Sequence, residues 1–120
     1  MRATQISIFL LFCFSICGFA QSGKLFTVDK ELSSSMVNKV TQDSKGNIWI
    51  ATEDGLNYYD GAKFLTFKHK KEDKSSIKSN YVLSVFNDSQ NNLYIGYVNG
   101  LQQYDYASGK FTDIPLLSAK

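Results

Sequence analysis

The stretch Asp43–Leu56 reads D-S-K-G-N-I-W-I-A-T-E-D-G-L and combines a polar turn, an apolar strand and a second tight turn. In the first turn, the Asp43 carboxylate can accept hydrogen bonds from the backbone N–H groups ahead of it, and Gly46 tolerates a positive φ. Residues 48–52 are apolar on both faces, which predicts a strand that is covered on both sides. Asp54-Gly55 then predicts a hairpin turn, because both residue types accept the left-handed angles that match strand twist.

A second copy of this stretch follows 45 residues later, as D-S-Q-N-N-L-Y-I-G-Y-V-N-G-L from Asp88 to Leu101. When Ser34–Asp60 is set over Ser79–Asp105, 11 of 27 positions are identical without a gap. A period near 45 in an all-strand pattern is typical of a β-propeller, in which each repeat forms one four-stranded sheet. We therefore predict an all-β fold with about two four-stranded antiparallel blades and an N-terminal closing strand, which is an incomplete propeller.

The first repeat predicts strands at residues 37–42, 48–52, 56–59 and 64–67. Val37 and Val40 lie three residues apart, so they can share a face only across a bulge. Trp49 lies in the most apolar strand, which favours a place in the core between blades over a sugar-stacking role. Asn99-Gly100 occupies the hairpin position of the second repeat, and we expect the same turn there. The repeated structural positions are Asp43, Gly46, Trp49, Gly55, Leu56, Asp88, Tyr94, Gly100 and Leu101.

The first twenty residues have the features of a secretory signal peptide. Arg2 is the only charge before Lys24, and Ile6–Gly18 is a nearly unbroken apolar run. Small residues precede the expected cleavage point, which predicts cleavage between Ala20 and Gln21. A membrane span needs roughly 20 apolar residues, so a retained N-terminal anchor is the competing interpretation and fits the run less well.

Changes in composition and the positions of the two repeats divide the rest of the chain into segments. Lys24–Val28 is similar to the fourth strand of the first repeat, and we interpret it as a closing strand for a blade outside this chain. The linker between the repeats carries mixed charge and few apolar groups, which predicts an exposed loop. The expected segments are a signal peptide (1–20), the closing strand (21–33), the first blade (34–67), the charged linker (68–78), the second blade (79–115) and a tail (116–120).

The residue types leave little room for catalysis or metal binding. Without Arg2, 12 lysines face 11 aspartates and glutamates, and no basic cluster indicates a nucleic-acid surface. His69 is the only histidine, so it cannot form a histidine metal cluster, and we expect an exposed loop residue. Asp43 and Asp88 lack the alternating acids of a calcium loop, which favours turn stabilisation. We expect no catalytic residue, no cofactor and no metal.

The run D-S-K-G-N-I-W-I-A-T-E-D-G-L-N-Y-Y-D closely resembles the two-component regulator propeller repeat. The core of that family is Asp-x-x-Gly-x-hydrophobic-Trp-hydrophobic-Gly-Thr-x-x-Gly-Leu. The first copy departs from it at Ala51, where the family favours glycine. The second copy departs at Asn91, Tyr94 and Tyr97. The resemblance covers Lys24 to about Ile114, which is nearly all of the chain after the predicted signal peptide.

The resemblance implies the periplasmic sensor region of a hybrid two-component regulator of the Bacteroidetes type. Such regulators place propellers before a membrane helix, a histidine kinase and often a response regulator, and many sense oligosaccharides. It also implies further blades of the same protein as partners, and a homodimer of the full-length sensor. Because nothing here resembles a kinase, a receiver or a DNA-binding domain, we interpret the chain as an N-terminal, non-enzymatic fragment that contacts no nucleic acid.

Two other classes of function stay open at this point. An exported propeller enzyme, such as a lyase or glycosidase, would need acids or histidines that converge at the ring centre. A propeller scaffold would bind a protein partner, and a gene remnant would have no function. By analogy with propeller architecture, ligand contacts are expected from the loops Ser33–Asn38 and Ser79–Tyr81 that enter the innermost strands.

Overall fold

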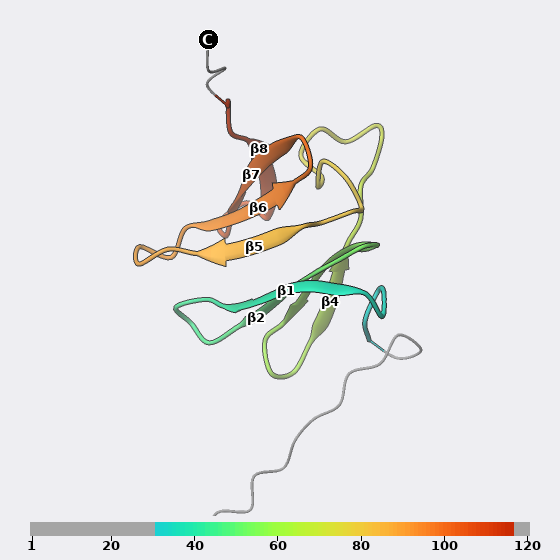
Figure 1. Ribbon diagram of the computed structural model, residues 1–120. Coiled ribbons are helices and arrows are strands. Elements are labelled where there is room, and N and C mark those ends of the chain that lie inside the picture. Colours follow the sequence, from blue (N-terminus) through green and yellow to red (C-terminus); the bar gives the residue numbers. More distant parts are fainter. Residues whose placement is uncertain (1–30, 117–120) are drawn as a thin grey trace, which may run out of the picture.

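A computed structural model describes residues 31–116 as eight β-strands without a helix in that range (Figure 1). The predicted signal peptide with the Ala20–Gln21 cleavage point, the closing strand Lys24–Val28 and the last four residues of the tail lie outside the described residues. The strands are β1 (Val37–Gln42), β2 (Ile48–Thr52), β3 (Gly55–Tyr59), β4 (Phe64–Phe67), β5 (Ser84–Asn87), β6 (Leu93–Tyr97), β7 (Gly100–Asp105) and β8 (Lys110–Asp113).

The strands form two four-stranded antiparallel sheets in chain order, which confirms the predicted all-β class with two blades. We call β1–β4 blade 1 and β5–β8 blade 2. Three strands of blade 1 have the predicted bounds, and β3 begins at Gly55, one residue before the prediction. The register of β1 against β2 shifts between Val37 and Lys39, and this irregularity is what Val37 and Val40 need in order to share a face.

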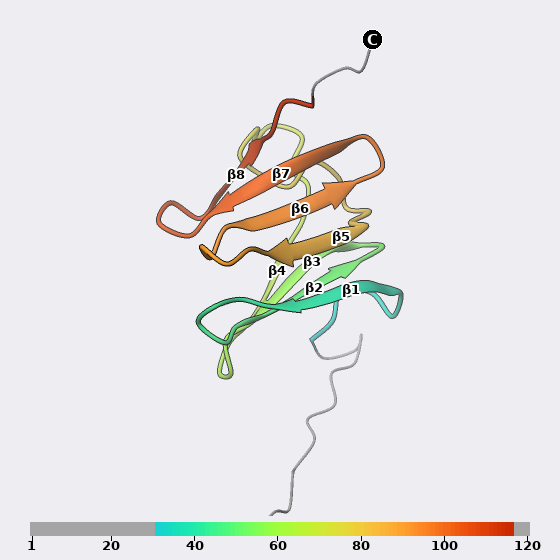
Figure 2. The same cartoon turned by 60° about the vertical axis from the view of Figure 1, so that its left-hand side comes forward.

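The two blades stack face to face, with β5 next to β1 (Figures 1 and 2). Backbone and amide groups hold this inner edge together. The Asn38 side chain donates to the Val82 carbonyl at 2.8 Å, and the Val82 N–H donates to the Thr52 carbonyl at 2.9 Å. The Gly55 N–H donates to the Asn80 carbonyl at 2.6 Å.

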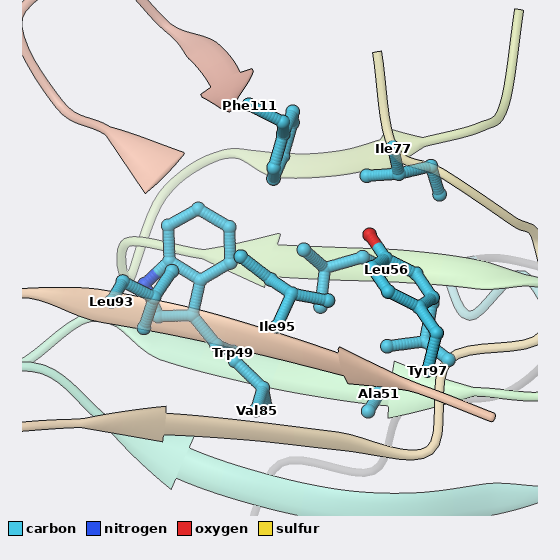
Figure 3. Packing of buried hydrophobic residues seen from close by; sticks show 10 residues of the cluster. Trp49, Ala51, Leu56, Ile77, Val85, Leu93, Ile95, Tyr97 and Phe111 are labelled. Carbon is cyan, nitrogen blue, oxygen red and sulfur yellow. The ribbon is translucent and has the colours of Figure 1, made fainter. Parts of the chain in front are cut away.

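One hydrophobic core lies between the blades and takes side chains from both (Figure 3). Blade 1 contributes Trp49, Ala51 and Leu56, and blade 2 contributes the opposite face of its own second strand, Leu93 and Ile95. Trp49 is 1% exposed, so the predicted place of this residue in the inter-blade core is observed. Among the described residues, the buried members of this cluster are Trp49, Ala51, Leu56, Ile77, Val82, Val85, Leu93, Ile95, Tyr97 and Phe111.

The linker between the blades corrects one sequence expectation. Most of residues 68–78 are exposed, but Ile77 is fully buried in the inter-blade core. The preceding backbone pairs with the outer strand of blade 2, since the Phe111 N–H donates to the Ser75 carbonyl at 2.9 Å. The prediction of an exposed loop is therefore correct for most of the linker and wrong for Ile77, whose side chain fills space between the sheets.

The turns of the two repeats also differ in one predicted respect. Gly46 has a φ of +86°, and Asn91, its counterpart, has a φ of +61°, which asparagine tolerates. Gly55 has a φ of +126°, whereas Gly100 lies outside the positive-φ region. The expectation of one shared hairpin solution is therefore wrong for Asn99-Gly100, whose glycine adopts a conformation that other residues can reach.

Candidate functional site

The loops that enter the innermost strands gather at one end of the two blades, which we call the linker end. It comprises the segment before β1, the hairpin turns after β2 and β6, and the linker into β5. The Glu53 N–H donates to the Met36 carbonyl at 3.1 Å, so the first hairpin turn is joined to the entry of β1. The structure thus brings both predicted loop regions, Ser33–Asn38 and Ser79–Tyr81, to the same end of the molecule.

Apolar side chains are exposed at the inner edge of the linker end. Met36 is 56% exposed and Tyr81, its counterpart one repeat later, is 42% exposed. The Tyr81 hydroxyl donates to Glu53 Oε1 at 3.3 Å, and the negative charge of Glu53 raises the Tyr81 pKa above its ordinary value. An exposed ring beside a carboxylate can bind a polar ligand with an apolar face, because the ring offers contact area and the carboxylate accepts hydrogen bonds.

Two small cavities border the linker farther from the inner edge. One, of about 220 Å³, lies between the outer strands and is lined by Phe67, Phe111 and Ile77, among others. The other, of about 210 Å³, is lined mainly by the charged linker and by Gln102 and Asp113. Both lie below the range of roughly 300–1,000 Å³ that is usual for ligand pockets, so neither forms a complete site within the described residues.

In each blade, one buried side-chain amide on the third strand binds the backbone of the segment that precedes the first strand. In blade 1, the Ser33 N–H donates to Asn57 Oδ1 at 3.2 Å, and Asn57 is fully buried. In blade 2, the Lys78 N–H donates to Gln102 Oε1 at 2.9 Å. Tyr97 donates its hydroxyl to the same oxygen at 2.6 Å, and burial raises the Tyr97 pKa. These amides fix the backbone at the entry to each blade through hydrogen bonds that are partly shielded from solvent.

At the opposite end of the blades, Asp43 is the centre of a buried polar cluster. Its Oδ1 atom accepts the N–H groups of Lys45 at 3.0 Å and Asn47 at 2.9 Å, as the sequence predicts. Its Oδ2 atom accepts the Trp49 indole N–H at 3.1 Å and the Tyr106 hydroxyl at 3.0 Å. Tyr106 belongs to blade 2, so this carboxylate joins the two blades.

The protonation of this cluster follows from its hydrogen bonds. Burial by itself would raise the Asp43 pKa, but the donors Trp49, Asn47 and Tyr106 together hold it below its ordinary value. Burial and the hydrogen bond to Asp43 raise the pKa of Tyr106. The carboxylate is therefore charged and the phenol neutral near pH 7, which is a structural arrangement and not that of an acid–base pair.

The other sequence-predicted positions are structural too. Leu56 is fully buried, and Leu101 is half-buried on the open side of blade 2. The Asp88 turn repeats the Asp43 turn, with N–H donors from Gln90 at 2.9 Å and Asn92 at 2.8 Å. Tyr94 occupies the Trp49 position and stacks on Phe86, with ring centroids 5.0 Å apart.

Within residues 31–116, no three His, Cys, Asp or Glu side chains lie close enough together to hold a metal ion. His69 is exposed, and its Nδ1 atom lies 2.8 Å from the Ile77 carbonyl. No helix of the described part of the chain has the length and apolar character needed to cross a membrane.

One family of known proteins has a sequence model that matches both repeats of this chain. The model of the family "Two component regulator propeller" matches residues 31–54 and 76–99, two segments that are 45 residues apart and cover corresponding parts of the blades. Both matched segments are similar to the two-component regulator propeller repeat. Each matched segment begins shortly before the first strand of a blade and runs through the first two strands to the following hairpin turn.

Two much longer proteins are similar to parts of this chain. Histidine kinase P4 of Formosa agariphila is 43% identical over 54 residues, which are 45% of this chain and 4% of that protein. The extracellular domain of BT4673 of B. thetaiotaomicron, described once as a one component and once as a hybrid two component system, has a TM-score of 0.62. That likeness, at 23% identity over 84% of this chain and 12% of the domain, supports the propeller fold.

Sequence reasoning missed three contacts that the fold creates. Tyr106 lies just after Asp105, where the gapless match between the repeats ends, and no aromatic residue stands at the corresponding place in the first repeat. Tyr81 aligns with Met36, and nothing in the pattern paired it with Glu53. For Ile77, the lone apolar residue in a charged linker was an available signal.

Proposed function

We propose that this chain contributes two neighbouring blades to the exported, ligand-sensing propeller of a hybrid two-component regulator. The observation that carries the proposal is the pair of family repeats folded as stacked blades with continuous inner-edge contacts. The matched histidine kinase and the matched extracellular domain are both much longer than this chain, which spans 4% and 12% of them. The kinase activity belongs to other parts of such a regulator, and these blades bind without catalysis.

The linker end is the part of this chain that we assign to ligand contact. Met36 and Tyr81 expose apolar surface at the inner edge, and Glu53 and Asn38 lie beside them with polar groups. An aromatic ring next to hydrogen-bonding groups suits an oligosaccharide, whose rings have apolar faces and hydroxyl edges. The remaining contacts would come from further blades around the ring, because a propeller site is assembled from several loops.

Calorimetry of the complete sensor region that contains these repeats, against a panel of oligosaccharides, tests the proposal. We expect one oligosaccharide class to bind, and Tyr81→Ala to weaken that binding at least tenfold. Lys45→Ala, at the opposite end of the blades, is the matched control and should leave affinity unchanged. Binding of a protein partner with no response to any oligosaccharide would favour the scaffold alternative, and an unchanged affinity of Tyr81→Ala would contradict the assigned contact surface.

A further inference from the structure

The two blades present their equivalent faces in different environments. The face of blade 1 that carries Trp49 and Ala51 is covered by blade 2 (Figure 3). The equivalent face of blade 2 carries Tyr94 and Gly96, which are half-buried, and Phe86, which is 43% exposed. Figure 2 shows blade 2 stacked on blade 1 through its other side. The interface between blade 1 and blade 2 therefore serves as a template for the kind of partner that could pack on the exposed Tyr94 face of blade 2.

In that template, Asp43 accepts two aromatic donors with one oxygen. The Trp49 indole comes from its own blade, and the Tyr106 hydroxyl comes from the turn between the third and fourth strands of the next blade. The Tyr106 ring also packs edge-on against Trp49, with centroids 6.1 Å apart. Asp43 is 5% exposed as a result.

Asp88 forms the same turn as Asp43, but no described tyrosine hydroxyl donates to its Oδ2 atom as Tyr106 donates to Asp43 Oδ2. Within residues 31–116, its Oδ2 atom accepts the side-chain N–H of Asn92 at 2.9 Å, as Asp43 Oδ2 does from Asn47 at 3.2 Å. Tyr94 replaces the tryptophan, and its ring is stacked on Phe86 at an interplanar angle of 26°. The described residues thus bring no aromatic donor to the Asp88 carboxylate, which is only half-buried.

We infer that Asp88 is a docking acceptor for a further blade of the same repeat type, one with a tyrosine in the turn between its third and fourth strands. That hydroxyl would bond to Asp88 as Tyr106 bonds to Asp43, while the blade covers Phe86, Tyr94 and Gly96. The inference rests on the proposed function in one respect, since it takes the chain as part of a larger propeller. It adds the residue that joins neighbouring blades and the donor that the next blade supplies.

A second copy of this chain fits the open face less well. The third-to-fourth turn of blade 1 is Asp60-Gly61-Ala62-Lys63, and it contains no tyrosine. Tyr59, which precedes this turn, already donates its hydroxyl to the Gly61 carbonyl at 2.9 Å. The outward face of blade 1 is also crossed by Ser33, which bonds to both Thr52 and Asn57. Blade 2 supplies the required donor, and blade 1 does not.

The chain's own second blade provides the test. A second copy of residues 68–116 is grafted after Ile114, which is the counterpart of the last residue of β4, so that the copied Tyr106 can reach Asp88. Thermal unfolding by circular dichroism is measured for the parent and the extended chain, each with and without Asp88→Ala. We expect Asp88→Ala to lower the melting temperature of the extended chain by about 2–8 °C more than that of the parent, the range for roughly one lost hydrogen bond.

The matched control carries Tyr106→Phe in the grafted copy alone. In that chain, the extra effect of Asp88→Ala should vanish, because the two changes remove the same contact. An equal shift from Asp88→Ala in parent and extended chains would overturn the inference, as would a graft that fails to raise the melting temperature. Concentration-dependent dimers of the parent chain that Asp88→Ala dissolves would overturn the chosen occupant in favour of a second copy. None of these results depends on ligand binding, so failure of the calorimetry would reject the sensing function and leave the docking inference intact.

Discussion

Blade 1 and blade 2 contain the same row of positions across their sheets, and the two rows have different compositions. In blade 1, Thr41, Trp49, Tyr58 and Leu65 pair side by side, and in blade 2 their counterparts are Phe86, Tyr94, Gln103 and Thr112. At the centre of the blade 1 row, Trp49 is packed against blade 2 and contacts four other rings, whereas Leu65 at the outer end of the row is exposed. The blade 2 row faces away from blade 1 and is more polar.

This difference teaches that the repeat preserves a backbone geometry and lets the side chains of each interface vary. Both aspartate turns close in the same way, and both third strands begin at the same hairpin position. The buried aromatic cluster belongs to one interface alone among the described residues. Substitutions at equivalent positions, such as Trp49 and Tyr94 or Gly55 and Gly100, should therefore have unequal effects.

Trp49→Ala should cost the most. It removes a fully buried ring from the cluster and leaves a large cavity, so we expect a loss of about 3–5 kcal/mol in the free energy of unfolding. Tyr94→Ala is the matched change on the open face and should cost about 1–2 kcal/mol. Urea unfolding followed by circular dichroism measures both, and equal losses would contradict the assignment of Trp49 to the inter-blade core.

Asp43→Ala should come next, at about 2–4 kcal/mol, because it leaves the indole N–H and the Tyr106 hydroxyl without an acceptor. The lowered pKa of Asp43 also gives a pH dependence. Its stabilisation is present above the unfolded-state value of about 3.9 and is lost as pH falls through the lower folded-state value. Unfolding free energies between pH 7 and pH 2 should show a smaller acid loss in Asp43→Asn than in the parent.

Gly55→Ala and Gly100→Ala compare the two hairpin turns. A Cβ at Gly55 would lie 2.9 Å from the Phe67 carbonyl oxygen, on a backbone with a φ of +126°, and we expect a cost of about 1–3 kcal/mol. A Cβ at Gly100 would meet the flexible end of the Lys78 side chain, which can move away. Gly100→Ala should be within about 0.5 kcal/mol of the parent. A larger cost at Gly100 than at Gly55 would contradict the difference in turn geometry.

Tyr106→Phe should cost about 1 kcal/mol, because the ring contacts with Trp49 and Tyr104 remain and one hydrogen bond is lost. The raised pKa of Tyr106 means that its neutral form is favoured in the folded state. This contribution is complete below the ordinary tyrosine value of about 10 and is lost as pH rises towards the folded-state value. Melting temperatures between pH 8 and pH 11 should fall less steeply in Tyr106→Phe than in the parent.

Much of the fold could be predicted from local chemistry. The apolar runs and the turn residues predict strands, and the 45-residue repeat shows that one unit is built twice. The spacing of Val37 and Val40 indicates that they can share a face only across a bulge, and the structure has a register shift between Val37 and Lys39. The loops of the candidate ligand surface followed from the architecture, but their individual residues did not, because Tyr81 reaches Glu53 only across the blade boundary.

The sequence by itself determined the blade: its four strands, its aspartate turn and the apolar strand with Trp49 are encoded within about 35 contiguous residues. Local hydrogen bonds and side-chain periodicity act over such distances, so they can be read along the chain. Only the tertiary structure decided which oxygen Tyr106 meets, that Ile77 enters the core, and that Gly55 needs a positive φ where Gly100 does not. These outcomes depend on how one blade lies on the next, and that packing joins residues as many as 63 positions apart.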